Sequence, residues 1–420
     1  MLKQLFSLDH GRESIPDGIR ASSAILALYV AFLPIATGLT GLIGSISPLN
    51  YIAALYLVVS FAELLRHPHP LFKKEFFLIY LYFAYTAASF LWNSDKQIEW
   101  QLTTFLTTAL LFAFAAGHGY NEKELKLFVI ASLVSIAIVF AVVAANFPTH
   151  SIRMVVRIVE TMDPNDFGCG LCVVIAMVMT MSLEKKNRWM VLILVLLFMT
   201  IILSSSRGAM LMASVMMIWW IGAAAAKKKI LIPLIPILLV GLLALAVLVF
   251  FPQKFNLSEK TIQFIIKRMN LLALLKDGGA GRSTIWRAAV NSFLQFRPIR
   301  MIFGYGHGAF AQTVQFQFAD KTYLSEAHNM YLKALIEGGI VGLLLLLSAF
   351  LQIFIYSIKR HNLWGTLAVI GFAVEGISLH AQVFRVFAWV FIVAAIYKGG
   401  DSFELQLSSS GDGDRPGLQS

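Results

Sequence analysis

The sequence predicts an all-α integral membrane protein with about twelve transmembrane helices and one large outward loop that itself contains helices. Of its 420 residues, 58% are hydrophobic and 14% are charged, whereas soluble domains carry roughly 25% charged residues. The apolar residues gather in runs near the length of about 20 residues that a spanning helix needs. Lysine and arginine gather in alternate short connections, and one polar connection late in the chain is far longer than the others.

The apolar runs define a series of predicted spans. Pro34 interrupts the first span, which is short, because proline cannot donate a helical hydrogen bond. The tenth span is long, so we expect it to be tilted or bent. The predicted spans are 22–37, 49–65, 74–92, 98–117, 125–146, 165–183, 188–204, 207–225, 230–251, 327–357, 363–381 and 384–398.

Charge in the short connections predicts the orientation of the spans, because cytoplasmic loops are rich in lysine and arginine. The connections after even-numbered spans carry most of these residues, namely Arg66, Lys73, Lys74, Lys123, Lys126, Lys185, Lys186, Arg188, Lys227, Lys228, Lys229, Lys359 and Arg360. Both termini are therefore predicted to be cytoplasmic, and residues 252–326 to face outward.

This pattern divides the chain into four parts. Residues 1–251 hold the first nine spans, 252–326 form the outward loop, and 327–398 hold the last three spans. Residues 399–420 are rich in Ser, Gly and Asp and are predicted to be a disordered cytoplasmic tail. The first twenty residues lack the apolar core of a cleavable signal peptide.

The cysteines and the net charge indicate which kinds of site and partner to expect. Cys169 and Cys172 share a helix face in an apolar run, so we interpret them as packing residues rather than a disulfide or a metal pair. The net charge of +11 is compatible with nucleic-acid binding, but in a membrane protein it favours anionic lipid headgroups and cytoplasmic loops. We therefore expect membrane lipids, and no nucleic acid, among the partners.

Two outward segments carry arginine against the insertion rule, which points to a use for positive charge on that side. Arg153 and Arg157 follow the fifth span. The long loop adds Lys267, Arg268, Lys276, Arg282, Arg287, Arg297 and Arg300. We favour an anionic ligand; the alternatives are salt bridges within the loop and contacts with lipid phosphates.

The long loop itself is predicted to contain helices. Residues 258–276 place apolar side chains at helical spacing, which predicts an amphipathic helix on the membrane surface or against the bundle. A second helix is predicted to begin near Arg282. Its expected buried residues are Trp286, Ala289, Val290 and Phe293. A turn with Gly304, Gly306 and Gly308 follows; spaced glycines let a backbone approach a ligand closely, although the GK[ST] element of a P-loop is absent.

The tenth span opens on His328-Asn329, and a glycine cluster of Gly338, Gly339 and Gly342 follows two to three turns later. An ionisable residue at the mouth of a membrane helix, beneath a large outward loop, is a functional-site hypothesis by default. Its position predicts chemistry at the membrane surface on a lipid-linked substrate.

Together these features resemble the O-antigen ligase and O-antigen polymerase superfamily. His328-Asn329 is followed after nine residues by Gly339-x-x-Gly342, as in that family. Three further elements agree: Ser205-Ser206-Arg207-Gly208-Ala209 at the outer start of the eighth span, Arg282-Ser283-Thr284-Ile285-Trp286 in the loop, and Arg157 followed by Asp163-Pro164-Asn165 before the sixth span. The resemblance covers roughly residues 150–345.

The resemblance implies a GT-C-like glycosyltransferase that needs no metal or other cofactor and acts on the periplasmic face of the bacterial inner membrane. The implied donor is O-antigen polysaccharide on undecaprenyl pyrophosphate. The implied acceptor is a sugar hydroxyl of lipid A–core.

The chemistry of such a donor assigns arginines to the leaving group. Negative charge builds on a phosphate oxygen as the glycosidic bond breaks, and a guanidinium remains charged and can bind phosphate through two hydrogen bonds. We expect Arg207 and Arg282 first in this role, then Arg157 and Arg153, with Arg385 as an accessory candidate. No pair of loop carboxylates has metal-site spacing, so no metal site is predicted.

His328 is the predicted general base, because a neutral histidine is the usual base near pH 7 and a helix N-terminus disfavours the imidazolium. Asn329 is expected to orient His328 or the acceptor, or to cap the helix. His307 is a candidate for acceptor binding, with loop structure as the favoured alternative, and Tyr331 is a further accessory candidate. Glu375 lies with His380 in the eleventh span, and we favour its structural pairing with an outward arginine.

Other functions stay open at this point. An O-antigen polymerase shares the donor chemistry, but polymerases tend to have two large outward loops, and here the loop at 147–164 is short. A protein O-glycosylation ligase is a further alternative, although such enzymes often carry more soluble sequence near the C-terminus. A polysaccharide flippase is the alternative from another class; transporters usually show internal repeats and polar breaks at the bilayer midplane, and neither is evident here.

Overall fold

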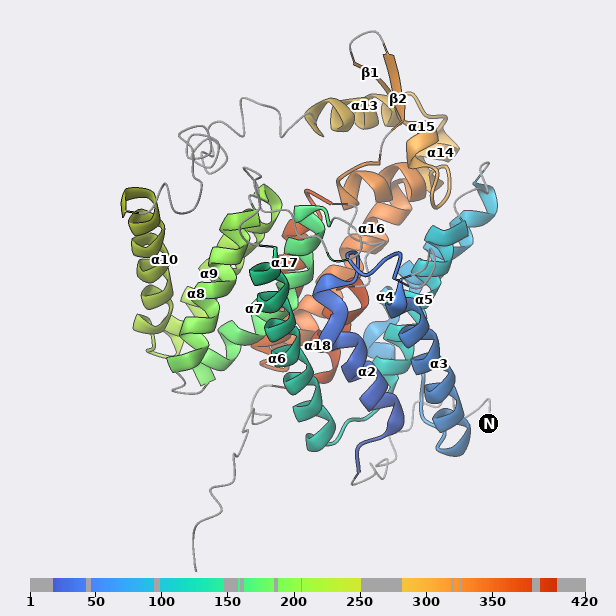
Figure 1. Cartoon of the computed structure of the whole chain (residues 1–420). Coiled ribbons are helices and arrows are strands. Elements are labelled where there is room, and N and C mark those ends of the chain that lie inside the picture. Colours follow the sequence, from blue (N-terminus) through green and yellow to red (C-terminus); the bar gives the residue numbers. More distant parts are fainter. Residues whose placement is uncertain are drawn as a thin grey trace, which may run out of the picture.

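The computed structural model describes residues 18–42, 47–93, 99–146, 158, 162–184, 188–204, 206–250, 282–318, 321–324, 326–379 and 386–398. These residues form a helical bundle with a layer of short elements across one end (Figure 1). The helices are α2 (Ala21–Phe32), α3 (Pro48–Arg66), α4 (Phe77–Ser89), α5 (Glu99–Gly117), α6 (Glu122–Ala145), α7 (Pro164–Glu184), α8 (Arg188–Ser204), α9 (Arg207–Ala226), α10 (Leu231–Phe250), α13 (Arg282–Leu294), α14 (Pro298–Phe303), α15 (Phe310–Thr313), α16 (Met330–Lys359), α17 (Leu363–Glu375) and α18 (Val386–Ile396). Three 3-10 turns are η1 (Leu33–Ile35), η2 (Lys74–Phe76) and η3 (Phe90–Trp92), and a hairpin pairs β1 (Gln315–Phe318) with β2 (Lys321–Leu324).

Each predicted span coincides with an apolar helix among the described residues. Six helical segments are long and apolar enough to cross a membrane: Pro48–Arg66, Lys74–Trp92, Glu122–Ala145, Pro164–Leu183, Arg207–Ala226 and Met330–Lys359. The other predicted spans correspond to shorter apolar helices, namely Ala21–Ile35, Leu102–Gly117, Trp189–Ser204, Leu231–Leu242, Leu363–Glu375 and Val386–Ile396. The helical fold is confirmed, and the six long apolar helices are consistent with a multi-pass membrane protein; the crossing of all twelve segments remains a prediction.

Both spans that were expected to be irregular are irregular, and the first has the cause that the sequence predicted. Pro34 lies in η1, where the first span changes from α-helix to a 3-10 turn. The tenth span, α16, is broken at Gly339, whose φ of 65° and ψ of −164° are not helical. The segment before Gly339 therefore belongs to the upper layer, and the longer segment after it descends through the bundle (Figure 1).

Both ends of the described chain meet at the same end of the bundle. The side-chain amide of Asn121 donates to the carbonyl of Gly18 at 2.8 Å, and the hydroxyl of Tyr397 donates to the carbonyl of Leu125 at 2.8 Å. Arg20 pairs with the buried Glu124 at 2.8 Å in the same region. The layer of short elements lies at the opposite end (Figure 1), as the predicted topology requires.

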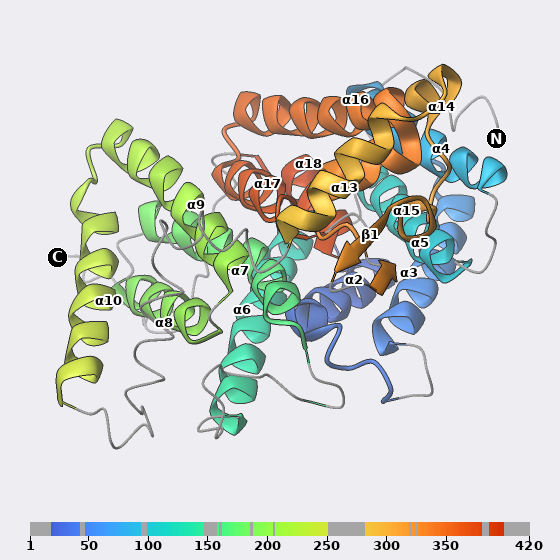
Figure 2. The ribbon, with the colours of Figure 1, turned by 90° about the horizontal axis from the view of Figure 1, so that it is seen from above.

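The upper layer has a small hydrophobic core of its own. Figure 2 shows α13 lying across the bundle, from above α7 and α17 towards α14. The buried members of this core are Ile285, Ala289, Phe310, Val314, Ala327 and Ile336, with Trp286 and Phe293 packed against them. The expectation that Val290 is buried was wrong: its side chain is 41% exposed, and Ile285 takes the inward position on α13.

The glycine-rich turn interlocks with the break in α16. A Cβ on Gly304 would lie 2.2 Å from the carbonyl oxygen of Glu337, and one on Gly339 would lie 2.3 Å from that of Ile302. Both glycines have φ near +70°, a conformation that favours glycine. The amides of Tyr305 and Gly306 donate to the carbonyls of Ile336 and Glu337, which the break leaves without helical partners. Gly304 thus serves close approach to the protein's own backbone rather than to a ligand.

A buried ionic network fastens this junction. Lys333 is fully buried and lies 3.0 Å from Glu326 and 3.4 Å from Glu337. His307 lies 3.5 Å from Glu337 on the far side. A buried charge that loses its partner is strongly destabilising, so this network holds the segment before α16 firmly against the layer.

Two sequence expectations have simple outcomes. Cys169 and Cys172 are buried as free thiols in the main hydrophobic core, where packing residues are expected. The amphipathic helix expected at 258–276 and the tail at 399–420 lie outside the described residues.

Candidate active site

Several helix ends meet beneath α13, at the end of the bundle that carries the upper layer. Arg207 is the first residue of α9, and Arg282 is the first residue of α13. His328 lies two residues before α16, and Glu375 is the last residue of α17. The N-terminus of α7, with Asn165 in its first turn, completes this group. Helix N-termini carry partial positive charge and exposed N–H groups, which suit an anionic ligand.

The Ser-Arg-Gly motif is built by hydrogen bonds between α9 and α7. Ser206 caps α9: its hydroxyl accepts from the amide of Ala209 at 3.2 Å and donates to the side-chain oxygen of Asn165 at 2.6 Å. Asn165 is in turn held by Asp163, whose carboxylate accepts from its backbone and side-chain amides at 2.7 and 2.8 Å. These contacts fix the backbone at the start of α9, where Arg207 lies between Ser206 and Gly208.

Gly208 lets the start of α9 pack closely against the end of α17. A Cβ there would lie 2.0 Å from the hydroxyl of Ser378 and 2.7 Å from a carboxylate oxygen of Glu375. A side chain at this position would have to displace the side chains of Ser378 and Glu375, which explains the glycine of the motif. The charge of Arg282 also acts on Glu375, so Arg282 and the start of α9 both lie near this acid.

His328 is fixed by its neighbours on both sides. The indole N–H of Trp286 on α13 donates to the carbonyl of Ala327 at 3.1 Å, and the amide of Met330 donates to the carbonyl of Gly376 at 2.7 Å. His328 itself has φ of 44°, a left-handed conformation uncommon for a residue with a side chain. Strained residues of this kind persist where the surroundings enforce them, often at functional sites.

The surroundings of His328 favour its neutral form. Burial lowers the pKa of His328 below its ordinary value of 6.5, and the positive charge of Arg282 lowers it further. The carboxylates of Asp163 and Glu326 oppose these effects without reversing them. A neutral imidazole at physiological pH is the form that can accept a proton.

The rate of the reaction should therefore fall only at acidic pH. If neutral His328 is the base, the rate falls as pH drops through its pKa, and the lowered pKa places this fall below pH 6.5. Arg282→Gln removes a charge that lowers this pKa, so the fall should move to higher pH. The measurement is the initial rate against pH for each variant.

Arg287→Gln is the matched control for that experiment. Arg287 is exposed on the same helix, and the substitution removes the same charge. A fall in rate at the same pH for wild type and Arg282→Gln would contradict the electrostatic link between Arg282 and His328.

The accessory candidates Asn329, Tyr331 and His307 all make hydrogen bonds within the protein. Asn329 caps α16, accepting from the amides of Tyr331 and Leu332 at 3.0 Å each, as in the capping alternative. The hydroxyl of Tyr331 donates to the carbonyl of Ala373 at 2.6 Å and ties α16 to α17. His307 is 1% exposed, and its carbonyl accepts from Asn93 at 2.7 Å. These contacts favour the loop-structure interpretation of His307 over acceptor binding.

Of the remaining predicted residues, only Glu375 belongs to the part of the chain that the structure describes. Arg153, Arg157, Arg385 and His380 lie outside the described residues. Glu375 is fully buried and accepts from the hydroxyl of Ser378 at 3.1 Å. Its pairing with an arginine remains a prediction.

Sequence reasoning missed the residues that position the site. Asp163 and Ser206 were noticed only as parts of motifs, and their contacts with Asn165 were not predicted. Lys333 and Glu337 were not singled out, although two opposite charges four residues apart in an apolar helix are a recognisable signal.

Residues 192–347 match the family model described as O-antigen ligase. The matched region runs from α8 into α16 and contains Arg207, Arg282 and His328. None of the curated proteins compared with the chain matches it. The family match confirms the resemblance drawn from the motifs, and the roles of individual residues remain predictions.

Proposed function

We propose that this chain is an O-antigen ligase that transfers O-antigen polysaccharide from undecaprenyl pyrophosphate to a sugar hydroxyl of lipid A–core, on the periplasmic face of the bacterial inner membrane. The observation that carries the proposal is the grouping of His328 and Arg282 with the start of α9, at the end of the bundle below the upper layer. The O-antigen ligase match over residues 192–347 supports the same conclusion.

The proposed reaction is a direct displacement at the sugar carbon that carries the pyrophosphate. The acceptor oxygen forms a bond to this carbon, and its proton passes to His328. The bond between the carbon and the pyrophosphate oxygen breaks, and its electron pair stays on that oxygen. Removing the proton during the attack makes the hydroxyl a competent nucleophile.

Arg207 and Arg282 are proposed to bind the pyrophosphate and to stabilise the charge that builds on its oxygen. Guanidinium groups held in place before the reaction stabilise this charge without reorganising. Arg153 and Arg157 are proposed as further phosphate contacts, and Arg385 as an accessory one. Fixed guanidinium groups can supply the stabilisation that a metal ion supplies in other enzymes.

Activity should accordingly survive a chelator. Purified protein reconstituted with donor and acceptor should keep its rate in excess EDTA, because the proposed stabilisation comes from arginine. A magnesium-dependent glycosyltransferase assayed in parallel shows that chelation is complete. Loss of activity that magnesium or manganese restores would mean that a metal takes part.

The predicted topology can be tested by cysteine labelling. Cys169 and Cys172 are buried, so single introduced cysteines should dominate the signal. In intact spheroplasts an impermeant reagent should label Thr313→Cys, in the upper layer, and should miss Lys228→Cys, between α9 and α10. The reverse pattern would place the site on the cytoplasmic side and remove the periplasmic assignment.

The acceptor is tested by competition. Proteoliposomes containing the purified chain and lipid-linked glycan are supplied with lipid A–core and free lipid-linked repeat together. A ligase attaches glycan to lipid A–core. Longer lipid-linked glycan would indicate a polymerase, and movement of the donor across the bilayer without transfer would indicate a flippase.

A further inference from the structure

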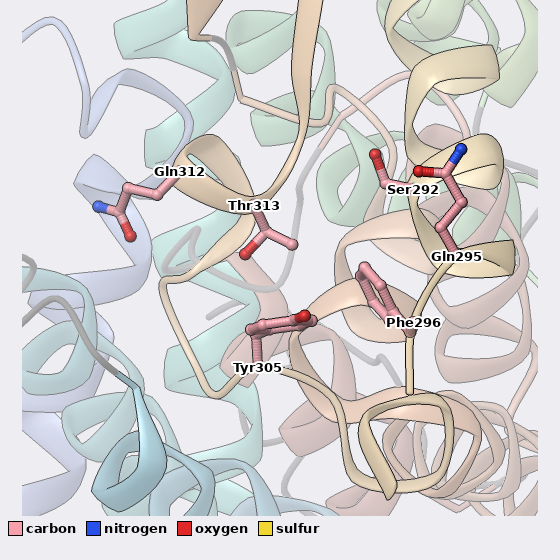
Figure 3. A pocket seen from close by; sticks show the side chains of 6 residues that line it. All are labelled: Ser292, Gln295, Phe296, Tyr305, Gln312 and Thr313. Carbon is pink, nitrogen blue, oxygen red and sulfur yellow. The ribbon is translucent and has the colours of Figure 1, made fainter. Parts of the chain in front are cut away.

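A cavity of about 390 Å³ opens in the upper layer, away from His328. Figure 3 shows α13 and the chain that follows it on one side, with Tyr305 and Thr313 facing them. The lining residues are Ser292, Gln295, Phe296, Tyr305, Gln312 and Thr313. This volume lies within the range of roughly 300–1,000 Å³ that is typical of small-molecule sites.

The lining combines aromatic rings with uncharged polar groups. Phe296 and Tyr305 supply rings, Ser292 and Thr313 supply hydroxyls, and Gln295 supplies an amide. Hydroxyls and amides both donate and accept hydrogen bonds, and aromatic rings present apolar faces. A sugar ring has the complementary surface, with hydroxyls around its edge and C–H groups on its faces. None of the described lining residues carries a charge, which favours a neutral sugar over a phosphate.

Tyr305, one of the lining residues, is held rigidly by its neighbours. The ring of Tyr305 packs edge-on against Phe296 with centroids 4.6 Å apart, and the guanidinium of Arg300 lies 5.0 Å from the centre of the Tyr305 ring. The amide of Tyr305 donates to the carbonyl of Ile336 in α16 at 3.1 Å. The ring is thus held in place before any ligand arrives, which lowers the entropic cost of binding.

The same helix connects this cavity to the candidate active site. Arg282 begins α13, and Ser292 lies ten residues further along it. At the helical rise of 1.5 Å per residue this is roughly 15 Å. A glycan whose reacting end lies at Arg282 and His328 therefore needs only a few sugar rings to reach the cavity.

We propose that this cavity is a glycan subsite that holds one neutral sugar ring, a few rings away from the reacting bond. The proposal rests on the proposed function, because it takes the glycan to be a substrate. The ring belongs either to the donor polysaccharide or to the acceptor core, and the two sources are separated by the experiment.

The test removes polar groups from the lining of the cavity and leaves the packed rings of Tyr305 and Phe296 unchanged. The double variant Ser292→Ala, Gln295→Ala replaces Ser292, which is half-buried on α13, and Gln295, which is exposed just after that helix. Alanine is the best helix former, so the change at Ser292 should leave α13 intact. Ser292→Trp fills the cavity instead. Asn291→Ala is the matched control, since Asn291 is an exposed amide on the same helix and does not line the cavity. Thermal unfolding of each purified variant checks the fold.

Two measurements test the subsite separately from the proposed function, one of binding and one of transfer kinetics. Binding of lipid-free repeat oligosaccharide and lipid-free core oligosaccharide is followed by ligand-observed NMR, which needs no turnover. Transfer kinetics are then measured with the donor varied at saturating acceptor, and with the acceptor varied at saturating donor. A donor that carries a single sugar, too short to reach the cavity, is included.

The double variant should raise the KM for one glycan substrate about tenfold, as expected for two lost hydrogen bonds, with kcat unchanged. Ser292→Trp should raise the KM at least as much, and Asn291→Ala should leave it unchanged.

The substrate whose KM rises identifies the glycan that occupies the cavity. A rise in the KM for the donor alone identifies the O-antigen chain, and the KM for the single-sugar donor should then be the same in variant and wild type. A rise in the KM for the acceptor alone identifies the core. Unchanged KM values and unchanged binding of both oligosaccharides would overturn the subsite. Oligosaccharide binding that the variants weaken, in a protein that transfers no glycan, would support the subsite and contradict the proposed function.

Discussion

His328→Ala should lower the rate of glycan transfer by about 10²–10⁴-fold, the usual contribution of a general base. The proposal gives His328 the proton of the acceptor hydroxyl, and alanine cannot accept it. The measurement is the initial rate of purified, reconstituted variant with saturating donor and acceptor. A variant that keeps more than about a tenth of the wild-type rate would show that the base lies elsewhere.

Two further variants separate chemistry from backbone strain. His328 has φ of 44°, and asparagine tolerates this conformation better than alanine. His328→Asn should therefore fold as well as wild type and still lose activity. His361 also has positive φ, at 55°, but lies exposed at the opposite end of α16, so His361→Ala should leave the rate unchanged.

Arg207→Lys and Arg282→Lys should each lower the rate about 10- to 10³-fold. Lysine keeps the positive charge but loses the planar fork that binds two phosphate oxygens together. Arg297→Lys is the control, because Arg297 is exposed in the upper layer and begins no helix of the candidate site. The measurement is the transfer rate at several donor concentrations. Near-normal rates for both variants would exclude arginine-specific recognition of the pyrophosphate.

The helices were predictable because their signal is local. A run of apolar residues of sufficient length predicts a membrane helix, and all of the predicted spans coincide with helices in the described part of the chain. Pro34 and the great length of the tenth span also predicted the two irregular helices. The location of the break at Gly339 was not predicted, because it depends on the backbone of Gly304 packing against it.

The site was predictable only as separate motifs. The sequence pointed to Arg207, Arg282 and His328 by residue type and by position at helix starts. The nearness of Arg282 to His328, and of the start of α9 to the end of α17, depends on contacts between distant residues. Examples are the hydrogen bond from Trp286 to Ala327 and the packing of Gly208 against Glu375. No periodicity in the sequence encodes these contacts.

Side-chain burial in the upper layer was the least predictable feature. Val290 was expected to be buried because it is apolar, but in so thin a layer the inward face of α13 is narrow and Ile285 and Ala289 fill it. Lys333, by contrast, is charged and fully buried, because Glu326 and Glu337 surround it. Polarity alone cannot predict such a pair.

The central claim is that one site at the outward end of the bundle binds the pyrophosphate and activates the acceptor. An experimental structure of the chain with undecaprenyl pyrophosphate bound tests it most directly. We expect the pyrophosphate within hydrogen-bonding distance of both Arg207 and Arg282, with His328 across the sugar position from the leaving oxygen, on the side from which the acceptor hydroxyl attacks. Guanidinium groups of Arg207 and Arg282 more than about 15 Å apart, or a pyrophosphate bound elsewhere, would contradict the claim, because the two arginines could not then share one ligand.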